Sequence, residues 1–201
     1  MRFIEDLDEL HLLYGTPGET SLRKVANKLT PEYRNWILRS RFCILTTVGP
    51  EGTDGTPRGD DGPVVTELDP GTLALPDWHG NNRIDSLRNI VRDPRVSLLF
   101  MVHGSNNVVR INGEARVSAD TEVIKKFARG RNLPRSVIVV KIAEVYGQCA
   151  RALVRSRLWG SGDESEGLPT IGQILSSLTD GQVGGQSYDE EWAGRAAKSL
   201  W

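Results

Sequence analysis

Apolar residues near the start of the chain recur at the spacing of a helix. Residues 3–13 carry an apolar side chain at every third position from Ile4 onward, and Gly15 then ends the pattern. A second helix is predicted from residue 21, and Pro31 is suited to open a third. We therefore expect helices ahead of the first strand.

From residue 42 the pattern changes to short runs rich in β-branched and aromatic residues, separated by Gly, Pro and Asp. Six strands are predicted, one within each of the segments FCILTTVG, GPVVTEL, TLALPDW, VSLLFMV, VVRINGEARV and SVIVVKIAEVY. Further helices are expected at residues 83–92, 121–129 and 148–159, and one begins near Thr170. Because strands and helices do not alternate as βαβ units, the fold class is α+β, with an antiparallel barrel and flanking helices.

The chain has 201 residues, which suits one domain with terminal extensions. We divide it into an N-terminal helical segment at residues 1–41, a barrel domain at 42–159 and a C-terminal extension with short helices at 160–201. The later part of the extension, GQVGGQSYDEEWAGR, is polar and rich in Gly, which predicts flexibility. Trp192 and Trp201 predict that its end docks on an apolar surface.

Composition argues against several classes of function. The chain has 25 Lys and Arg against 26 Asp and Glu, so no broad basic surface is expected for nucleic acid or a membrane. The segment MRFIEDLDEL lacks the basic and apolar regions of a signal peptide, and no apolar run is long enough to span a membrane. Cys43 and Cys149 show no metal-ligand or redox spacing. We expect a cytoplasmic protein with reduced, inert thiols and no metal.

The stretch HGNNRIDSLRN, residues 79–89, places polar residues where an extended segment becomes a helix. Helix starts leave backbone N–H groups unpaired and carry partial positive charge, so they bind anions readily. Arg83 and Ser86, one helical turn apart, and Asn82 beside them form a candidate phosphate site. The alternative interpretation is an ordinary surface helix that Asn caps. The chain contains no dinucleotide fingerprint and no P-loop.

Six short motifs follow one another in an order that is itself informative. They are TPRGD at residues 56–60, LPDW at 75–78, GNNRIDSLRNI at 80–90, DPRVSLLF at 93–100, VRINGEA at 109–115 and CARALVRSRLW at 149–159. In this order and spacing the chain resembles the pyridoxamine 5′-phosphate oxidase-like, FMN-binding split-barrel superfamily. The likeness is greatest to a bacterial branch of FMN-dependent enzymes without an assigned substrate.

The resemblance implies a six-stranded Greek-key split barrel, a homodimer, and FMN bound in clefts at the subunit interface. It implies that residues 42–159 form the FMN-binding domain. The cofactor-binding residues that it implies are Arg58, Gly59, Asp60, Pro76, Asp77, Asn82, Arg83, Ser86, Arg110, Arg155 and Trp159. Among these, Arg58 approaches the flavin ring, and Arg110 is a second source of charge for the phosphate. Arg155 and Trp159 complete the cleft from the same or the other subunit.

Two departures from the family pattern bear on activity. The segment GPVVTELD lacks the Lys of authentic pyridoxamine phosphate oxidases, and the chain ends AAKSLW without their basic motif. Both departures argue against oxidation of vitamin B6 and leave the binding of FMN in place. The leading hypothesis is an FMN-dependent oxidoreductase of unknown substrate. The alternatives are a non-catalytic flavin-binding or flavin-sensing protein, and a split-barrel reductase that uses F420 or binds haem. No catalytic acid or base is identified.

Overall fold

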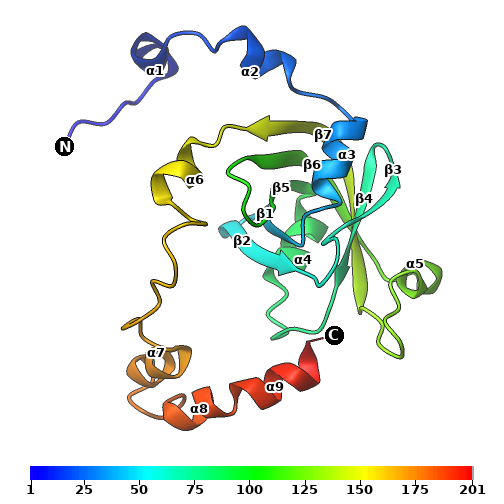
Figure 1. Cartoon of the computed structure of the whole chain (residues 1–201), viewed down its shortest axis with the longest axis vertical. Helices are drawn as coiled ribbons and strands as arrows, with labels where there is room; N and C mark the ends of the chain where they lie inside the picture. Colours follow the sequence, from blue (N-terminus) through cyan, green and yellow to red (C-terminus); the bar gives the residue numbers. More distant parts are fainter. Residues whose placement is uncertain (201) are drawn as a thin grey trace.

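Three short helices precede the sheet in the computed structural model, which describes residues 1–200 (Figure 1). They are α1 (Leu7–Tyr14), α2 (Glu19–Arg23) and α3 (Pro31–Ile37). The side chain of Thr30 caps α3 by accepting from the backbone N–H of Tyr33, and Pro31 opens the helix as expected. Helices α1 and α2 bury none of their residues, whereas α3 places Ile37 in the core.

Seven antiparallel strands form one sheet in the order β2-β1-β5-β6-β7-β4-β3. The strands are β1 (Phe42–Gly49), β2 (Gly52–Gly59), β3 (Thr66–Asp69), β4 (Thr72–Asp77), β5 (Arg95–Met101), β6 (Val108–Ser118) and β7 (Ser136–Gln148). The predicted count of six strands was wrong, because β2 has the sequence GTDGTPRG and resembles a turn. A strand with Pro and little apolar character is tolerated here because β2 lies at the edge of the sheet and pairs only with β1.

Backbone pairing ends at β2 on one side and at β3 on the other, so the described residues show an open sheet rather than a closed barrel. The sheet is nevertheless curved. Arg58 of β2 forms an ion pair with Asp77 of β4, although four strands lie between β2 and β4 in the order of the sheet. This contact requires the two ends of the sheet to approach each other.

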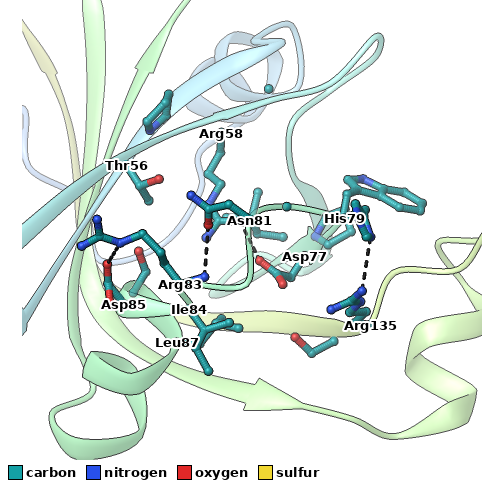
Figure 2. A pocket seen from close by; sticks show the side chains of 18 of the residues that line it. Thr56, Arg58, Asp77, His79, Asn81, Arg83, Ile84, Asp85, Leu87 and Arg135 are labelled. Carbon is teal, nitrogen blue, oxygen red and sulfur yellow. Dashed lines mark hydrogen bonds and ion pairs between the residues drawn. The ribbon is translucent and has the colours of Figure 1, made fainter. Parts of the chain in front are cut away.

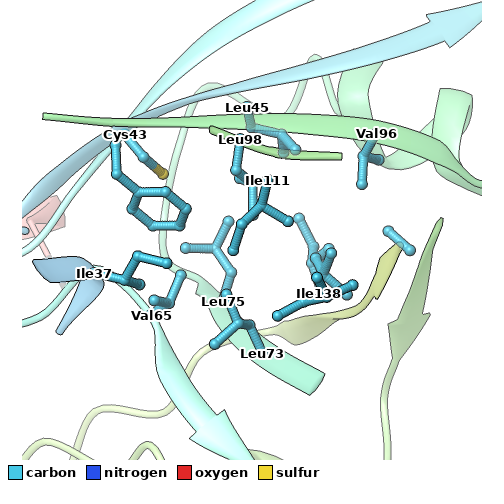
Figure 3. Close-up of a cluster of buried hydrophobic side chains, with 14 of the residues drawn as sticks. Ile37, Cys43, Leu45, Val65, Leu73, Leu75, Val96, Leu98, Ile111 and Ile138 are labelled. Atoms are coloured by element: carbon cyan, nitrogen blue, oxygen red, sulfur yellow. The ribbon is translucent and has the colours of Figure 1, made fainter. Parts of the chain in front are cut away.

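Alternate residues of the strands form the hydrophobic core (Figure 3). Strand β1 buries Cys43 and Leu45, and β5 buries Leu98 and Phe100, with the intervening residues more exposed. This is the period of two that the sequence predicted for both strands. Burial of each Leu side chain contributes roughly 1.5–3 kcal/mol to folding. Ile37 of α3 closes the core at one end.

Helix α4 (Asp85–Arg92) is held against the sheet by a buried polar contact. The Asn89 amide donates to the Thr47 hydroxyl of β1 over 3.1 Å, and Ile90 is buried beside it. Gly49 leaves room for this contact, since a Cβ at that position would overlap the Asn89 side chain. Helix α4 is therefore fixed relative to β1.

The remaining helices follow the strands towards the C-terminus. They are α5 (Thr121–Lys125), α6 (Arg151–Ser156), α7 (Ile171–Leu178), α8 (Gln186–Glu190) and α9 (Trp192–Ser199). The capping box of Thr170 and Gln173 is present at the start of α7, as predicted. No helix among residues 1–200 is both long and apolar enough to cross a bilayer.

The Gly-rich part of the C-terminal extension contains α8 and the start of α9. Its glycines permit close packing: a Cβ on Gly184 would overlap the backbone oxygen of Gly172, in α7. Asp189 of α8 accepts from the backbone N–H of Gly172 over 2.9 Å. Trp192 is exposed, and Trp201 lies outside the described residues.

Gly113 provides a test of the sheet's packing. It lies at a bulge in the β6–β7 ladder, where a Cβ would overlap the backbone carbonyl oxygen of Lys141. Gly113→Ala is expected to lower the free energy of unfolding by about 1–3 kcal/mol, because backbone has to move to admit the methyl group. Gly147→Ala is the matched control, since Gly147 lies in the same ladder and a Cβ added there would meet no atom within 4 Å. Urea denaturation measures both, and equal stabilities for the two variants would contradict this account.

Candidate functional site

A cavity of about 990 Å³ lies between β2, the end of β4 and the start of α4 (Figure 2). Residues 54–61 form one wall and residues 75–87 another, and Arg135 and Ser136 contribute from the start of β7. This volume falls at the upper end of the range of small-molecule sites, about 300–1,000 Å³. The cavity exists because the curved sheet brings β2 towards β4.

Most of the residues predicted to bind a cofactor line this one cavity. They are Arg58, Gly59, Asp60, Pro76, Asp77, Asn82, Arg83 and Ser86. They come from segments far apart in sequence, which the sheet and α4 bring together. Arg110, Arg155 and Trp159 do not line it.

Arg58 and Asp77 form the ion pair at the centre of the cavity wall. The Arg58 Nη1 donates to Asp77 Oδ1 over 2.6 Å, and the two side chains are 21% and 15% exposed. The Arg58 Nε is buried and has no hydrogen-bond partner among the described residues. Buried donors are nearly always satisfied in native proteins, so this N–H calls for an acceptor that a ligand can supply.

Cys43 lies directly opposite Arg58 in the β1–β2 ladder and is fully buried. Burial raises the pKa of its thiol to about 12, although the positive charge of Arg58 acts in the opposite direction. The thiol therefore stays protonated near neutral pH, which argues against a nucleophilic role for Cys43.

The loop that leads into α4 has an unusual backbone. Asn82 and Ile84 both adopt left-handed conformations, with φ of 61° and 52°. This conformation is strained for a β-branched residue such as Ile84, and strain of this kind is concentrated at functional sites. Ile84 occupies the N-cap position without a side-chain cap, so the proposed Asn cap is absent. The first N–H groups of α4 are left available for an anion.

Two carboxylates lie beside this helix start. Arg83 donates through Nε to Asp85 over 2.8 Å, and the Ser86 hydroxyl donates to Asp54 over 2.6 Å. Ser86 is 5% exposed, whereas the Arg83 side chain is 76% exposed. An anion at the helix start would therefore compete with Asp85 for Arg83.

Sequence reasoning did not identify Arg135, which lines the cavity next to the α4 loop. Its Nη1 donates to Asn82 Oδ1 over 2.7 Å, and its Nη2 lies 3.2 Å from His79 Nδ1. Figure 2 shows Arg135 and His79 together on one side of the cavity. More than 50 residues separate Arg135 from these partners in sequence, so no local motif could have indicated the contact.

Sequence reasoning also did not identify Arg129, which contacts residues of the cavity wall. It pairs with Asp60, whose side chain is 4% exposed, and with Asp61, and it lies over the ring of Trp78 at 5.5 Å. The Arg129 guanidinium lowers the pKa of Asp61. Asp60, Pro76 and Trp78 also line a second cavity of about 900 Å³, so they form a partition between the two.

The three remaining predicted residues lie elsewhere in the same chain. Arg110 is in β6, and its buried Nε has no hydrogen-bond partner among the described residues. The Trp159 indole donates to the backbone oxygen of Ser105 over 2.8 Å and packs against His103. Arg155 is exposed on α6.

The sequence profile of the pyridoxamine 5′-phosphate oxidase family matches residues 29–149, more than half of the chain. The chain belongs to this family. The resemblance inferred from the motifs is thereby confirmed, and the matched segment includes every strand of the sheet and the whole wall of the cavity apart from Leu200. A search of curated proteins found no match.

Solved structures of similar proteins come from several bacteria. A variant of HupZ from Group A Streptococcus is 18% identical with a TM-score of 0.50, and the match covers 59% of this chain and 98% of that one. A Lactobacillus delbrueckii protein, assigned provisionally as a pyridoxamine 5′-phosphate oxidase, is 28% identical with a TM-score of 0.49, covering 60% and 95%. The FAD binding protein of Mycobacterium smegmatis is 14% identical with a TM-score of 0.43, covering 61% and 97%. The likeness to HupZ supports the fold alone.

The Arg58–Asp77 pair is expected to contribute measurably to stability. Asp77→Asn should lower the free energy of unfolding by roughly 1.5–3 kcal/mol, because it leaves a largely buried guanidinium without its charged partner. Glu51→Gln is the matched control, since the Glu51–Arg92 pair is 73% and 50% exposed and should change stability by about 0.5 kcal/mol or less. A double-mutant cycle with Arg58→Met measures the coupling. A coupling near zero would show that the two side chains act independently.

Proposed function

We propose that the chain is an FMN-dependent oxidoreductase that acts on a small molecule. The observation that carries the proposal is the composition of one cavity. It combines a buried arginine N–H without a partner, on Arg58, with a helix start without a side-chain cap, at α4. FMN presents a ring with hydrogen-bond acceptors and a phosphate, and these two features suit the two parts of that ligand.

The start of α4 carries groups that attract a phosphate and two carboxylates that repel it. The backbone N–H groups of the first turn and Arg83 favour an anion, whereas Asp54 and Asp85 oppose it. Arg83 is exposed and its partner Asp85 is close by in the chain, so this ion pair contributes little stability and can be exchanged for a phosphate. Asp54 already accepts a hydrogen bond from the Ser86 hydroxyl.

Arg58, Pro76 and Asp77 fit the flavin ring. FMN supplies the redox chemistry by accepting and passing on a hydride or electrons. The chain's residues hold the ring and adjust its electronic properties. A cation beside the ring favours the reduced anion, and Arg58 can take this role while Asp77 holds its guanidinium in place.

A second copy of the chain completes the proposed site. Arg110, Arg155 and Trp159 lie away from the cavity of their own chain, and we propose that a homodimer brings them to the cavity of the partner. Analytical ultracentrifugation with and without FMN tests the proposed dimer.

Substitution of Arg83 tests the proposed phosphate site. Arg83→Ala should weaken FMN binding about ten- to a hundredfold, which corresponds to a charge-assisted contact of roughly 1.5–3 kcal/mol. Riboflavin binding should change little, because riboflavin lacks the phosphate. Arg92→Ala, at the far end of the helix that Arg83 precedes and outside the cavity, is the matched control. Quenching of flavin fluorescence gives all the affinities.

The outcomes separate the hypotheses. Equal losses for FMN and riboflavin would move Arg83 away from the phosphate. Failure of the unaltered protein to bind either flavin would overturn the proposed function, and F420 and haem would then be titrated in turn. Binding of FMN without any acceptor-dependent reoxidation, across a panel of quinones, nitroaromatic compounds and oxygen, would favour the non-catalytic flavin-binding protein.

A further inference from the structure

Three arginines line the cavity in the described part of the chain, and they differ in how their charge is balanced. Arg58 is paired with Asp77, and Arg83 with Asp85. Arg135 instead contacts two neutral acceptors, the Asn82 amide oxygen and the His79 ring nitrogen, and forms no ion pair with a described carboxylate. Among the three, Arg135 is therefore the arginine without a direct ion-pair partner in the described part of the chain.

Arg135 is also held in a defined position. Its backbone N–H donates to the carbonyl oxygen of Asp77 over 3.1 Å, and the next residue, Ser136, pairs with Asp77 in the β4–β7 ladder. Its side chain is fixed at the other end by Asn82, whose left-handed backbone directs the loop. Because the backbone and the guanidinium of Arg135 are both held, a ligand that binds there costs less conformational entropy of the side chain.

The guanidinium has donors to spare. The bonds to Asn82 and His79 use one N–H on each terminal nitrogen, which leaves the Nε–H and a second N–H on each terminal nitrogen. Paired N–H groups of this kind match the oxygens of a carboxylate or a phosphate. Because a guanidinium can only donate, the hydrogen bond at His79 Nδ1 has the ring nitrogen as its acceptor.

Arg135 and Arg83 lie on different sides of the cavity. Figure 2 shows Arg83 with Asp85 on one side, Arg135 with His79 on the other, and Asp77 between them. In the proposed function, the start of α4 and Arg83 hold the FMN phosphate, so Arg135 lies towards the part of the cavity left for a second ligand. We propose that Arg135 binds the anionic group, a carboxylate or a phosphate, of the substrate that reacts with the flavin. This inference rests on the proposed function.

The test uses the full chain loaded with FMN, so that the phosphate site at α4 is already filled. Sodium phosphate and sodium acetate are titrated separately at an ionic strength held constant with sodium chloride. The Nε–H signals of the arginines in proton–nitrogen NMR spectra report binding. We expect a saturable shift of the Arg135 signal, and Arg135→Ala should weaken the affinity about tenfold or more, as expected for a charge-assisted fork contact.

Two further variants keep the result interpretable. Arg131→Ala removes the same charge from the same loop at a residue that does not line the cavity, and it should bind the anions like the unaltered protein. Arg135→Lys keeps the charge without the fork and should retain part of the affinity. The chemical-shift dispersion of the Arg135→Ala spectrum is compared with that of both variants. Equal dispersion shows that a loss of affinity in Arg135→Ala does not come from misfolding.

Each outcome has a distinct meaning. Equal anion affinities in Arg135→Ala, Arg131→Ala and the unaltered protein would overturn the inference and leave Arg135 as a solvated surface residue. Anion binding at Arg135 only in the FMN-free chain, with Arg135→Ala weakening FMN more than riboflavin, would assign Arg135 to the cofactor phosphate and overturn the inference while the proposed function stands. Anion binding through Arg135 in a chain that binds no flavin would overturn the proposed function and with it the role of this anion as a flavin substrate.

Discussion

The ion pair between Arg58 and Asp77 joins two strands that are far apart in the order of the sheet, and the cavity depends on that approach. Strand β2 pairs only with β1, and β4 is separated from it by four strands. Were the sheet flat, these strands would lie about 24 Å apart, given a spacing of roughly 4.8 Å between neighbours. The observed contact of 2.6 Å therefore reflects strong curvature, which the bulge opposite Gly113 assists, because the extra residue, Ala143, bends β7. The space enclosed by this curvature is lined by β2, β4 and the α4 loop.

Sequence reasoning recovered the parts of the structure that have a local cause. Strands β1 and β5 follow a period of two, and the capping box marks the start of α7, so both were predicted correctly. Strand β2 was missed because its stability comes from pairing with β1 and not from its own composition. The exact positions of α8 and α9 have no local signal, because glycines in contact with a neighbouring helix look the same in sequence as glycines in a flexible linker.

The same distinction applies to the candidate site. Arg58, Asp77 and Arg83 lie in motifs with a recognisable order, and the fold brings them to one cavity. Arg129 and Arg135 belong to no such motif, and their partners are more than 50 residues away in sequence. Family likeness can therefore indicate where a ligand binds, whereas the balance of charge around it emerges only in the folded chain. The contrast between Arg58, with its carboxylate partner, and Arg135, without one, is of this second kind.

The loop before α4 lowers the stability of the fold at this site. A left-handed Ile84 at the N-cap costs of order 1–3 kcal/mol in backbone strain, and the missing cap forgoes about 1 kcal/mol more. Ser, Asp or Asn at that position would make a more stable helix, and the Ile84 side chain is 47% exposed. The strain has two structural consequences: the N–H groups of the first turn stay open towards the cavity, and Asn82 is turned towards Arg135. A ligand that bonds to these N–H groups would recover stability that the free chain lacks, so anion binding and helix stability are coupled at this loop.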